Sequence, residues 1–347
     1  MLVWKEKKAL LLKSRTPERI TNIIPSAKTF TVKGIPYVAV PHKLAETKML
    51  KNLGYEPPAP IREYYDWPGR FKPFDAQREA AAFLSMHGRA FNLSELGTGK
   101  SLASLWAYDY LRGIGKVNKA LIVSPLSTLE RTWADEVFQH FPHLETAVLH
   151  GSRDKRVKML KTDVDIYIIN HDGLQIIEPH LKDRPDIDII IIDEIAQAAR
   201  NAGTDRWKAI NKVVNRQGIP RYCWGMTGTP TPNAPTDAWA QCRLINPESV
   251  PPYFNRFKGQ VMRQLGQFSW IPKSDATEIV QAVMQPSVRF TRDECLDLPP
   301  LMYETRQVPL TKEQNKAYKE MVAKMRTEAE QGEITAVNEA VKMGKLV

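Results

Sequence analysis

The chain has 347 residues, enough for about two domains, and 43% of them are hydrophobic, a share that suits globular packing. Its 49 Lys and Arg exceed its 39 Asp and Glu, and the formal charge of +10 favours a polyanionic partner, although a solvated basic surface is the alternative. No stretch approaches the ~18 apolar residues that a membrane span requires. Lys5, Lys7 and Lys8 follow the apolar start, the reverse of a secretory signal, so we expect a cytoplasmic protein with no membrane partner.

The first 68 residues are predicted to form a small basic accessory module. Residues 1–70 contain 13 Lys or Arg but only 6 Asp or Glu. The pattern predicts a hairpin, a helix and a stiff linker: strands at 28–33 and 37–40 around a turn at 34–36, a helix at 41–53, and the linker at 54–60.

Aromatic residues follow the linker beside two arginines. Tyr64, Tyr65 and Trp67 lie close to Arg62 and Arg70 in the sequence. Such residues could stack on unpaired bases. Packing against the next domain is the interpretation we favour.

A glycine-rich turn comes next, between the short apolar run at 90–93 and a helical pattern. In Ser94–Ser101, Gly97 and Gly99 let the backbone N–H groups point at phosphate oxygens, and Lys100 supplies a positive charge. Thr98 lies between the glycines, and Ser101 could hold Mg²⁺. The usual pattern has a further glycine where this chain has Ser94. An ordinary strand-to-helix turn remains the alternative.

A second site element is an acidic pair after an apolar run. Ile189–Ile192 predicts a buried parallel strand that ends at Asp193 and Glu194. Asp193 would hold the metal, directly or through water, and Glu194 would orient or deprotonate the attacking water. A strand followed by a helix-capping acid is the alternative.

A third element is the turn at 226–233, which follows a strand-like stretch at 221–224. Thr227, Gly228 and Thr229 make a compact turn whose hydroxyl groups could bond the carboxylates and relay their state. In order behind the loop and the acidic pair, this turn supports one common site.

Strands and helices alternate along the chain. Strands are predicted at 89–93, 119–124, 145–150, 165–170, 187–192, 221–226 and 302–308, and helices at 75–87, 100–113, 127–140, 152–161, 204–215 and 235–245. This alternation predicts an α/β fold, a parallel sheet with helices on both faces, with the ligand at the carboxyl edge. We expect a nucleotide-binding lobe at 69–250 and an aromatic, basic helical insertion at 251–300. The segment 301–347 would hold the last strand and an amphipathic helix from Thr311 to Met325.

These elements resemble the first motor lobe of a superfamily-two DNA translocase of the Swi/Snf type, in the compact form found in bacteria and their phages. The matching motifs follow one another in the family's order between Phe71 and about Met321. Besides the three elements above, the matches are 74–78, 121–127 with Trp133 and Glu136, 166–174, Arg200-Asn201 and Leu298-Pro299-Pro300. The resemblance implies a RecA-like P-loop lobe that binds ATP and Mg²⁺, with Gln77 reading adenine.

The resemblance also implies a DNA surface at the carboxyl ends of neighbouring strands. Its predicted contacts are Ser124, Pro125, Ser127, Asn170, His171, Thr229 and Asn233. Such groups grip phosphates without reading bases, so binding should be indifferent to DNA sequence. The N-terminal module resembles, by order and size, the substrate-recognition module of annealing helicases.

Two departures from the family pattern matter. The family usually has a small residue and then histidine after Asp-Glu, whereas this chain has Ile195-Ala196-Gln197, so Gln197 would have to supply the missing hydrogen bond that couples ATP to DNA. The sequence printed here ends at Val347, so we expect the second lobe, with its arginine for the transferring phosphoryl group, to be encoded downstream, and the 347-residue chain alone to hydrolyse ATP poorly.

The sequence therefore predicts the ATP-binding half of a monomeric DNA-dependent ATPase that acts on duplex or forked DNA in replication or repair. The alternative is a DNA-binding module or partner platform with residual nucleotide affinity. A small-molecule phosphotransferase would not explain the turn at Thr227–Thr229 or the DNA-facing motifs.

Overall fold

The apolar runs of the sequence become the strands of one parallel sheet in the computed structural model, which describes residues 1–216, 222–266, 269–295, 304, 308–324, 326–329 and 332–335. The sheet has seven strands in the order β13-β5-β10-β9-β6-β8-β7, and every neighbouring pair is parallel. Their bounds are β5 Arg89–Asn92, β6 Lys119–Ser124, β7 Thr146–Val148, β8 Ile166–Asn170, β9 Ile187–Ile192, β10 Tyr222–Met226 and β13 Ser287–Val288.

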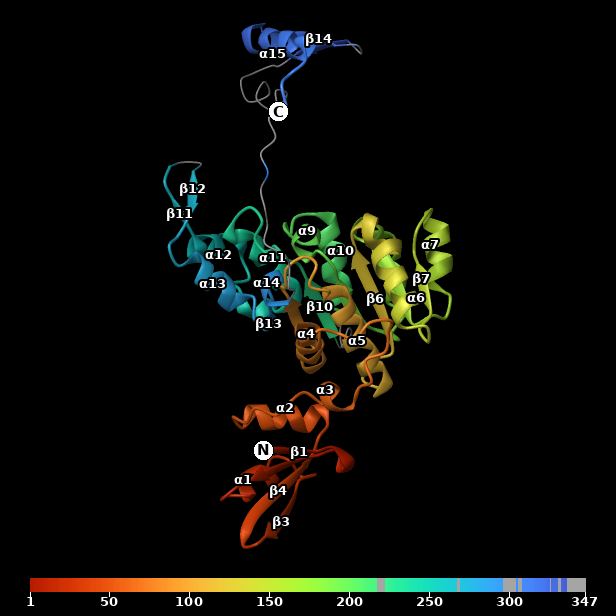
Figure 1. Ribbon diagram of the computed structural model, residues 1–347, viewed down its shortest axis with the longest axis vertical. Helices are drawn as coiled ribbons and strands as arrows, with labels where there is room; N and C mark the ends of the chain where they lie inside the picture. The colour runs from red at the N-terminus through yellow and green to blue at the C-terminus, as the bar shows by residue number, and fades with distance from the viewer. Residues whose placement is uncertain are drawn as a thin grey trace. The chain divides into compact units, whose positions relative to one another are not determined.

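Helices cover both faces of this sheet (Figure 1). They are α4 Asp75–Met86, α5 Lys100–Gly113, α6 Asp135–His140, α7 Arg153–Leu160, α8 Leu174–Leu181, α9 Ile195–Ala198, α10 Asp205–Val214 and α11 Ala238–Ile245. The central strand β9 serves both layers because successive side chains of a strand point to opposite faces. Ile189 and Ile191 pack with α4, α5 and α6, whereas Ile190 and Ile192 pack with α8, α10 and α11. The predicted α/β class is therefore confirmed.

The predicted strands and helices of the lobe occur in the structure wherever it describes them, but some details differ. The helix expected at 127–140 begins with a short 3₁₀ turn and a π-helical turn, Leu129–Ala134, before α6. Helices α8 and α9 and strand β13 were not predicted. Arg221, at the predicted start of β10, lies outside the described residues.

The N-terminal module contains a four-stranded antiparallel sheet of order β1-β2-β4-β3. Its strands are β1 Leu2–Trp4, β2 Ala9–Lys13, β3 Lys28–Val32 and β4 Ile35–Pro41, and its helices are α1 Glu18–Thr21 and α2 Leu44–Asn52. The predicted hairpin and helix are confirmed. The turn lies at residues 33–34 and not at the predicted 34–36. Lys33 and Gly34, with φ of 51° and 77°, make the two-residue turn that a tight hairpin favours.

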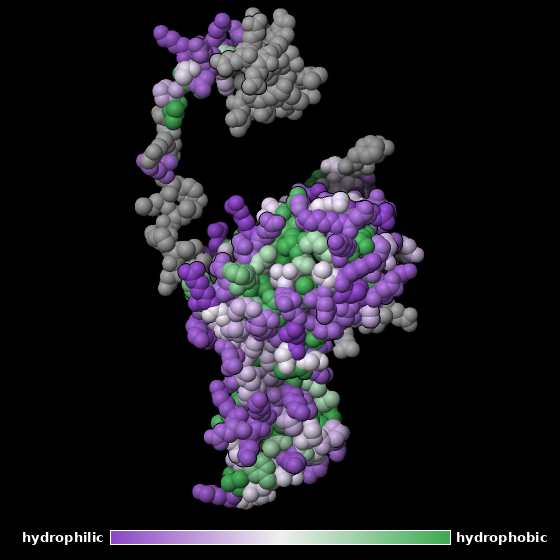
Figure 2. Space-filling view, turned by 90° about the vertical axis from the view of Figure 1, so that its right-hand side faces the viewer, coloured by the Kyte–Doolittle hydropathy of each residue, from purple (hydrophilic) through white to green (hydrophobic). Residues whose placement is uncertain are grey.

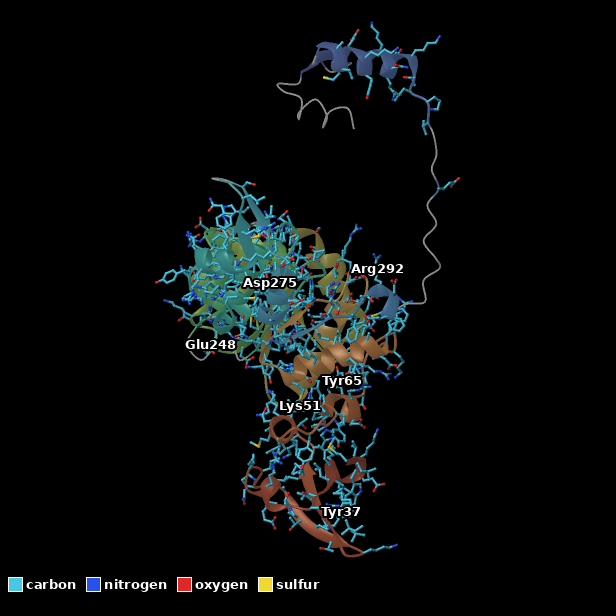
Figure 3. All side chains as sticks on the ribbon, turned by 90° about the vertical axis from the view of Figure 1, so that its left-hand side faces the viewer. Tyr37, Lys51, Tyr65, Glu248, Asp275 and Arg292 are labelled. Carbon is cyan, nitrogen blue, oxygen red and sulfur yellow. The ribbon has the colours of Figure 1, made fainter. Side chains whose placement is uncertain are left out.

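The aromatic residues after the linker pack within the protein. Tyr65 follows α3, Pro60–Tyr64 (Figure 3). Its hydroxyl donates to Asp109 Oδ2 at 2.6 Å, and Trp67 packs edge-on against Trp106 with ring centroids 5.9 Å apart. Trp67 is buried. These two rings therefore join the module to α5, as the packing interpretation predicts.

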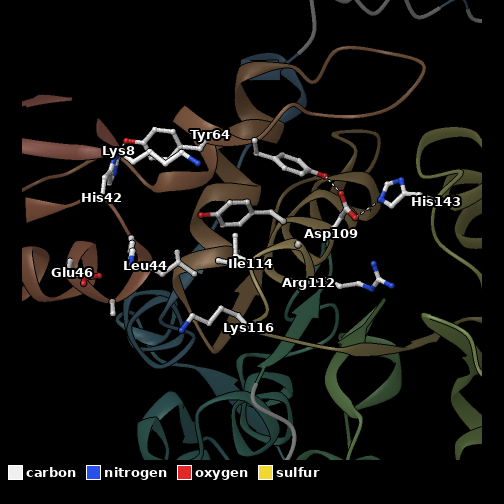
Figure 4. Close-up of a pocket in the computed structure, with 15 residues that line it drawn as sticks. Lys8, His42, Leu44, Glu46, Tyr64, Asp109, Arg112, Ile114, Lys116 and His143 are labelled. Carbon is white, nitrogen blue, oxygen red and sulfur yellow. Dashed lines mark hydrogen bonds and ion pairs between the residues drawn. The ribbon is translucent and has the colours of Figure 1, made fainter. Parts of the chain in front are cut away.

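A cavity of about 820 Å³ lies in the seam between the N-terminal module and α5 (Figure 4). Apolar and aromatic side chains line it together with lysines, among them Leu44, Tyr64, Ile114 and Lys116. The buried ring of His42 closes one side through bonds between its Nδ1 and Tyr64 Oη, 2.9 Å, and between its Nε2 and the Pro58 carbonyl, 2.8 Å. The cavity lies at the opposite end of α5 from Lys100.

The segment after α11 leaves the sheet and then returns to it. It forms α12 Phe254–Val261, a hairpin of β11 Met262–Gln264 and β12 Trp270–Pro272, and α13 Ala276–Val283, and ends at the edge strand β13, which is followed by α14 Arg292–Cys295. Phe257 is fully buried in the core beneath the sheet, and Lys258 Nζ lies 3.9 Å from the centroid of the Trp270 ring. Phe268 lies outside the described residues.

Two compact units divide the chain, Met1–Asp297 and Leu298–Val347. In the second, α15 Lys312–Lys324 confirms the helix predicted from Thr311, and β14 Arg326–Ala329 pairs antiparallel with β15 Gly332–Thr335. The boundary at 298–300, residue 325 and most of the strand predicted at 302–308 lie outside the described residues. Hydrophilic side chains prevail on the face in Figure 2, and no helix of the described residues is long and apolar enough to span a membrane.

Replacing Tyr65 by Phe should lower the free energy of unfolding by about 2 kcal/mol, because it removes the hydrogen bond to a buried carboxylate. Urea unfolding measures the change. Tyr253→Phe, at a site 76% exposed, is the control and should be neutral. Equal stability of the two variants would show that the seam does not depend on this bond.

Candidate nucleotide and nucleic-acid site

The loop between β5 and α5 has the backbone that the glycines predict. Gly97 and Gly99 have φ of 85° and 77°, a left-handed region that side chains with a Cβ rarely adopt. A Cβ on Gly99 would also lie only 2.0 Å from Gln77 Nε2. Gln77 therefore lies directly against the loop, and its Oε1 accepts a hydrogen bond from the Phe74 N–H at 2.9 Å.

Lys100 is the buried cation of this loop. Its Nζ donates to the Glu95 carbonyl at 3.0 Å, and the residue is only 9% exposed. Burial lowers the pKa of Lys100, and the nearby charges of Glu194, Asp193 and Glu95 oppose that shift. No ion pair to Lys100 occurs within the described part of the chain. A buried ammonium held only by a carbonyl suits an anionic ligand such as a phosphate.

Asp193 follows β9, and both of its carboxylate oxygens accept hydrogen bonds. Its Oδ2 accepts from the Trp133 indole N–H at 3.0 Å, and its Oδ1 accepts from the Glu194 N–H at 3.0 Å. The Asp193 main-chain carbonyl lies 2.8 Å from His171 Nε2. Burial, the main cause, raises the pKa of Asp193 to about 6. Hydrogen bonds thus orient the carboxylate, but they do not fully offset the burial of its negative charge. Both features are expected of a metal ligand.

Glu194 follows in a left-handed conformation, with φ of 47° and ψ of 52°. Such a backbone in a residue other than glycine costs of order 1–3 kcal/mol and often marks a functional site. Its Oε2 accepts from the Thr227 hydroxyl at 3.1 Å, and the same hydroxyl accepts from the Thr229 N–H at 3.2 Å. The turn after β10 thus reaches the carboxylate, as the sequence predicts for Thr227.

Gly228 brings that turn against the phosphate loop. A Cβ at this position would lie 3.3 Å from the Leu96 nitrogen, so the two backbones approach closely. Ser101, at the start of α5, and Thr98, whose hydroxyl donates to the Glu95 carbonyl at 2.8 Å, complete the loop. The structure therefore brings the three predicted elements together.

Gln197 does not supply the hydrogen bond expected of it. Its side chain is exposed and has no hydrogen-bond partner among the described residues. Only its main chain is engaged, through its N–H to the Glu194 carbonyl at 2.8 Å and its carbonyl to Arg206 at 3.5 Å. A glutamine one residue beyond the usual histidine points away from the acidic pair because α9 turns it outward.

The predicted DNA contacts divide into exposed and buried groups. Ser127, Thr229 and Asn233 are exposed. Ser124 is fully buried at the end of β6, directly beside Asn170 of β8, whose Oδ1 accepts from Arg156 at 2.8 Å. Pro125, which follows Ser124 in the chain, is half-buried.

His171, a predicted DNA contact, is buried in the structure. It is 4% exposed, and burial lowers its pKa to about 4, so the ring is neutral at ordinary pH. Because its Nε2 faces a carbonyl, that nitrogen donates the bond to Asp193. In this structure His171 supports Asp193 and does not offer its ring to DNA.

Two residues of a predicted motif, Trp133 and Glu136, are neighbours of Asp193. Trp133 is fully buried, and Glu136 has an Oε2 atom without a hydrogen-bond partner among the described residues. Burial, with a smaller contribution from Asp193, raises the pKa of Glu136 to about 7. The signal was the three-residue spacing, which places both side chains on the same side of a helical turn.

A phosphate loop after β5, an acidic pair after β9 and, between them in the sheet, a hydroxyl turn after β10 define a RecA-like nucleotide-binding lobe. Residues 87–345 match the SNF2-related domain, and the chain belongs to that family. Gln77 lies ahead of the matched range.

Related proteins share only part of their length with this chain. Protein p41 of Acyrthosiphon pisum secondary endosymbiont phage 1 is 28% identical over 178 residues, which are 49% of this chain and 38% of that protein. A Caenorhabditis elegans homologue of the SWI/SNF-related, matrix-associated, actin-dependent regulator of chromatin subfamily A containing DEAD/H box 1 is 24% identical over 260 residues, 69% of this chain and 25% of that protein.

A solved structure supports the fold. The Sulfolobus solfataricus SWI2/SNF2 ATPase core in complex with dsDNA superposes with a TM-score of 0.54 and 23% identity, covering 65% of this chain and 46% of that chain. At this identity the likeness concerns the fold of the lobe.

Replacing Trp133 by Phe should weaken the Mg²⁺-dependent part of ATP binding by about tenfold, because outer-shell partners of a metal ligand typically contribute that much. Titrating ATP at several Mg²⁺ concentrations measures the effect. Trp224→Phe is the matched control, since Trp224 is equally buried but donates to the His87 carbonyl at 3.0 Å. The same Mg²⁺ dependence in both variants would show that Trp133 does not position Asp193.

Proposed function

We propose that this chain is the ATP-binding motor lobe of a DNA-dependent ATPase that translocates on duplex or forked DNA. The observation that carries the proposal is the grouping of Asp193 and Glu194 with buried Lys100, which forms no ion pair among the described residues, at one edge of the sheet. Membership of the SNF2-related family supports the same activity. A role in replication or repair fits this activity.

The residues of the loop would bind and orient the triphosphate of ATP. Lys100 would exchange the Glu95 carbonyl for a phosphate oxygen, and the left-handed glycines leave room for the phosphates to approach the backbone. Ser101 and Asp193 would hold Mg²⁺, which when bound neutralises phosphate charge. Gln77, against Gly99, would contact adenine at the end of the loop.

Glu194 would orient the attacking water and accept its proton. The Thr227 bond fixes one oxygen of this carboxylate, which leaves the other free to face the water. Because Gly228 also lies against the phosphate loop, the turn after β10 would transmit the state of the nucleotide site to Thr229.

DNA would bind along the carboxyl ends of β6, β8 and β10. Ser127, Thr229 and Asn233 are exposed there, and short polar groups of this kind contact phosphates without reading bases. The formal charge of +10 favours the same partner. The similar Sulfolobus solfataricus core was solved with dsDNA, which supports the assignment.

The second candidate is a DNA-binding platform that retains nucleotide affinity without coupled turnover. Gln197 favours it, because its exposed side chain does not engage the acidic pair in the described structure. ATP turnover that does not respond to DNA would support this alternative.

Replacing Lys100 by Ala should weaken ATP binding by at least about tenfold, whereas Glu194→Gln should leave binding nearly intact and abolish hydrolysis. Fluorescent-nucleotide titration and steady-state phosphate release measure the two effects. The division of roles is wrong if both variants lose the same nucleotide affinity.

DNA affinity should be independent of sequence and fall steeply with salt. Contacts to about six phosphates would reduce affinity by about a thousandfold between 50 and 200 mM salt. Fluorescence anisotropy with two unrelated duplexes measures this. Asn233→Asp should weaken binding by repelling phosphates, whereas Asn118→Asp, beside the amino end of β6, is the matched control. A salt-insensitive or sequence-selective affinity would contradict the proposal.

A further inference from the structure

A segment near the end of the first unit runs alongside the phosphate loop. We call Pro286–Arg292 the strap. Three main-chain bonds join it to β5 and the loop: Phe91 N–H to the Pro286 carbonyl at 3.0 Å, Leu93 N–H to the Val288 carbonyl at 2.8 Å, and Glu95 N–H to the Phe290 carbonyl at 2.9 Å. The strap thus extends the edge strand β13 onto the loop itself.

Side chains of the loop complete this attachment. The Ser94 hydroxyl accepts from the Phe290 N–H at 3.1 Å, and the Glu95 carboxylate accepts from the Arg292 N–H at 3.1 Å. Ser94 is 2% exposed, so its bond satisfies a main-chain donor that glycine would leave unmatched. The serine that departs from the usual loop pattern therefore has a partner in the strap.

The strap places Phe290 beside the loop and Gln77. Phe290 closes a space of about 10 Å³ whose other walls are residues of α4 and the loop, Ala76, Gln77, Ala80, Asn92, Ser94, Thr98, Gly99, Lys100 and Ala103. Phe290 is itself half-buried, so part of its ring faces outward. An aromatic face beside the residue expected to read adenine is suited to a base.

Arg292, labelled in Figure 3, lies on α14 at the end of the strap, beside Gly97 of the loop. A Cβ on Gly97 would come 3.8 Å from Arg292 Cδ. The Arg292 side chain is 57% exposed, and its Nε lies 3.9 Å from Glu95 Oε2. An exposed ion pair at this distance contributes little, so the guanidinium can exchange the carboxylate for a phosphate at small cost.

We propose that the strap is the third wall of the nucleotide site, in which Phe290 packs on the base opposite Gln77 and Arg292 contacts the phosphates. The inference rests on the proposed function, because it assigns further binding residues to the same site. It gives the loop an aromatic surface and a second cation besides Lys100.

Competition binding with three ligands separates the two roles. Phe290→Ala should weaken ATP and GTP alike by about tenfold, since stacking depends little on base identity, and should leave inorganic tripolyphosphate unaffected. Arg292→Gln should weaken all three ligands by about tenfold. Phe290→Leu, which preserves apolar packing, should weaken both nucleotides in the same direction and so guards against misfolding of the alanine variant.

The matched controls are Phe254→Ala and Arg256→Gln on α12, which should change none of the three affinities. Unchanged nucleotide affinity in Phe290→Ala, or an equal loss of tripolyphosphate, would overturn the base contact. Unchanged affinities in Arg292→Gln would overturn the phosphate contact. If Lys100→Ala weakens ATP while both strap variants do not, the strap alone is wrong. If Lys100→Ala is also without effect, the nucleotide site itself is wrong.

Discussion

The burial of Lys100 is the constraint to which the rest of the site is fitted. An ammonium taken out of water loses hydration, and a single carbonyl restores only part of it. Asp193 and Glu194 lie near enough to oppose the lowering of the Lys100 pKa, although they form no ion pair with it in the described structure. The pKa of buried Asp193 is displaced upward at the same time. Opposite charges are thus held near one another but incompletely compensated, which is how a site preorganised for phosphate and a cation is built.

The parallel sheet makes this arrangement possible. All neighbouring strands run in one direction, so the loop after β5, the acidic pair after β9 and the hydroxyl turn after β10 emerge at the same edge. Strand β9 lies between β6 and β10, and its isoleucines anchor both cores. Trp133 and His171 then hold Asp193 from two other connections. The acid is positioned by packing on both sides of the sheet.

The elements that the sequence predicted well were those with local signals. Continuous apolar runs located β6, β8 and β9, and glycine spacing located the loop. The elements that it missed depend on contacts between distant parts of the chain. Two residues are too few to predict β13, whose pairing with β5 joins segments nearly 200 residues apart. The role of His171 likewise depends on burial beneath Asp193, which a polar residue after a strand does not reveal.

The two departures from the family pattern have different physical consequences. Ser94 replaces a glycine and gains the Phe290 N–H, so the loop is fixed to the strap. Gln197, one residue beyond the usual histidine position, has no side-chain partner in the described structure. There the link to the loop after β8 passes through Arg206, whose Nε donates to Asp172 Oδ1 at 2.8 Å while its other nitrogen reaches the Gln197 carbonyl. Asp172 is the chain neighbour of His171, which donates to the Asp193 carbonyl. Arg206 therefore connects the segment after Glu194 to the residue next to His171. Within the described structure, Gln197 therefore contacts this arginine through its main-chain carbonyl and not through its side chain.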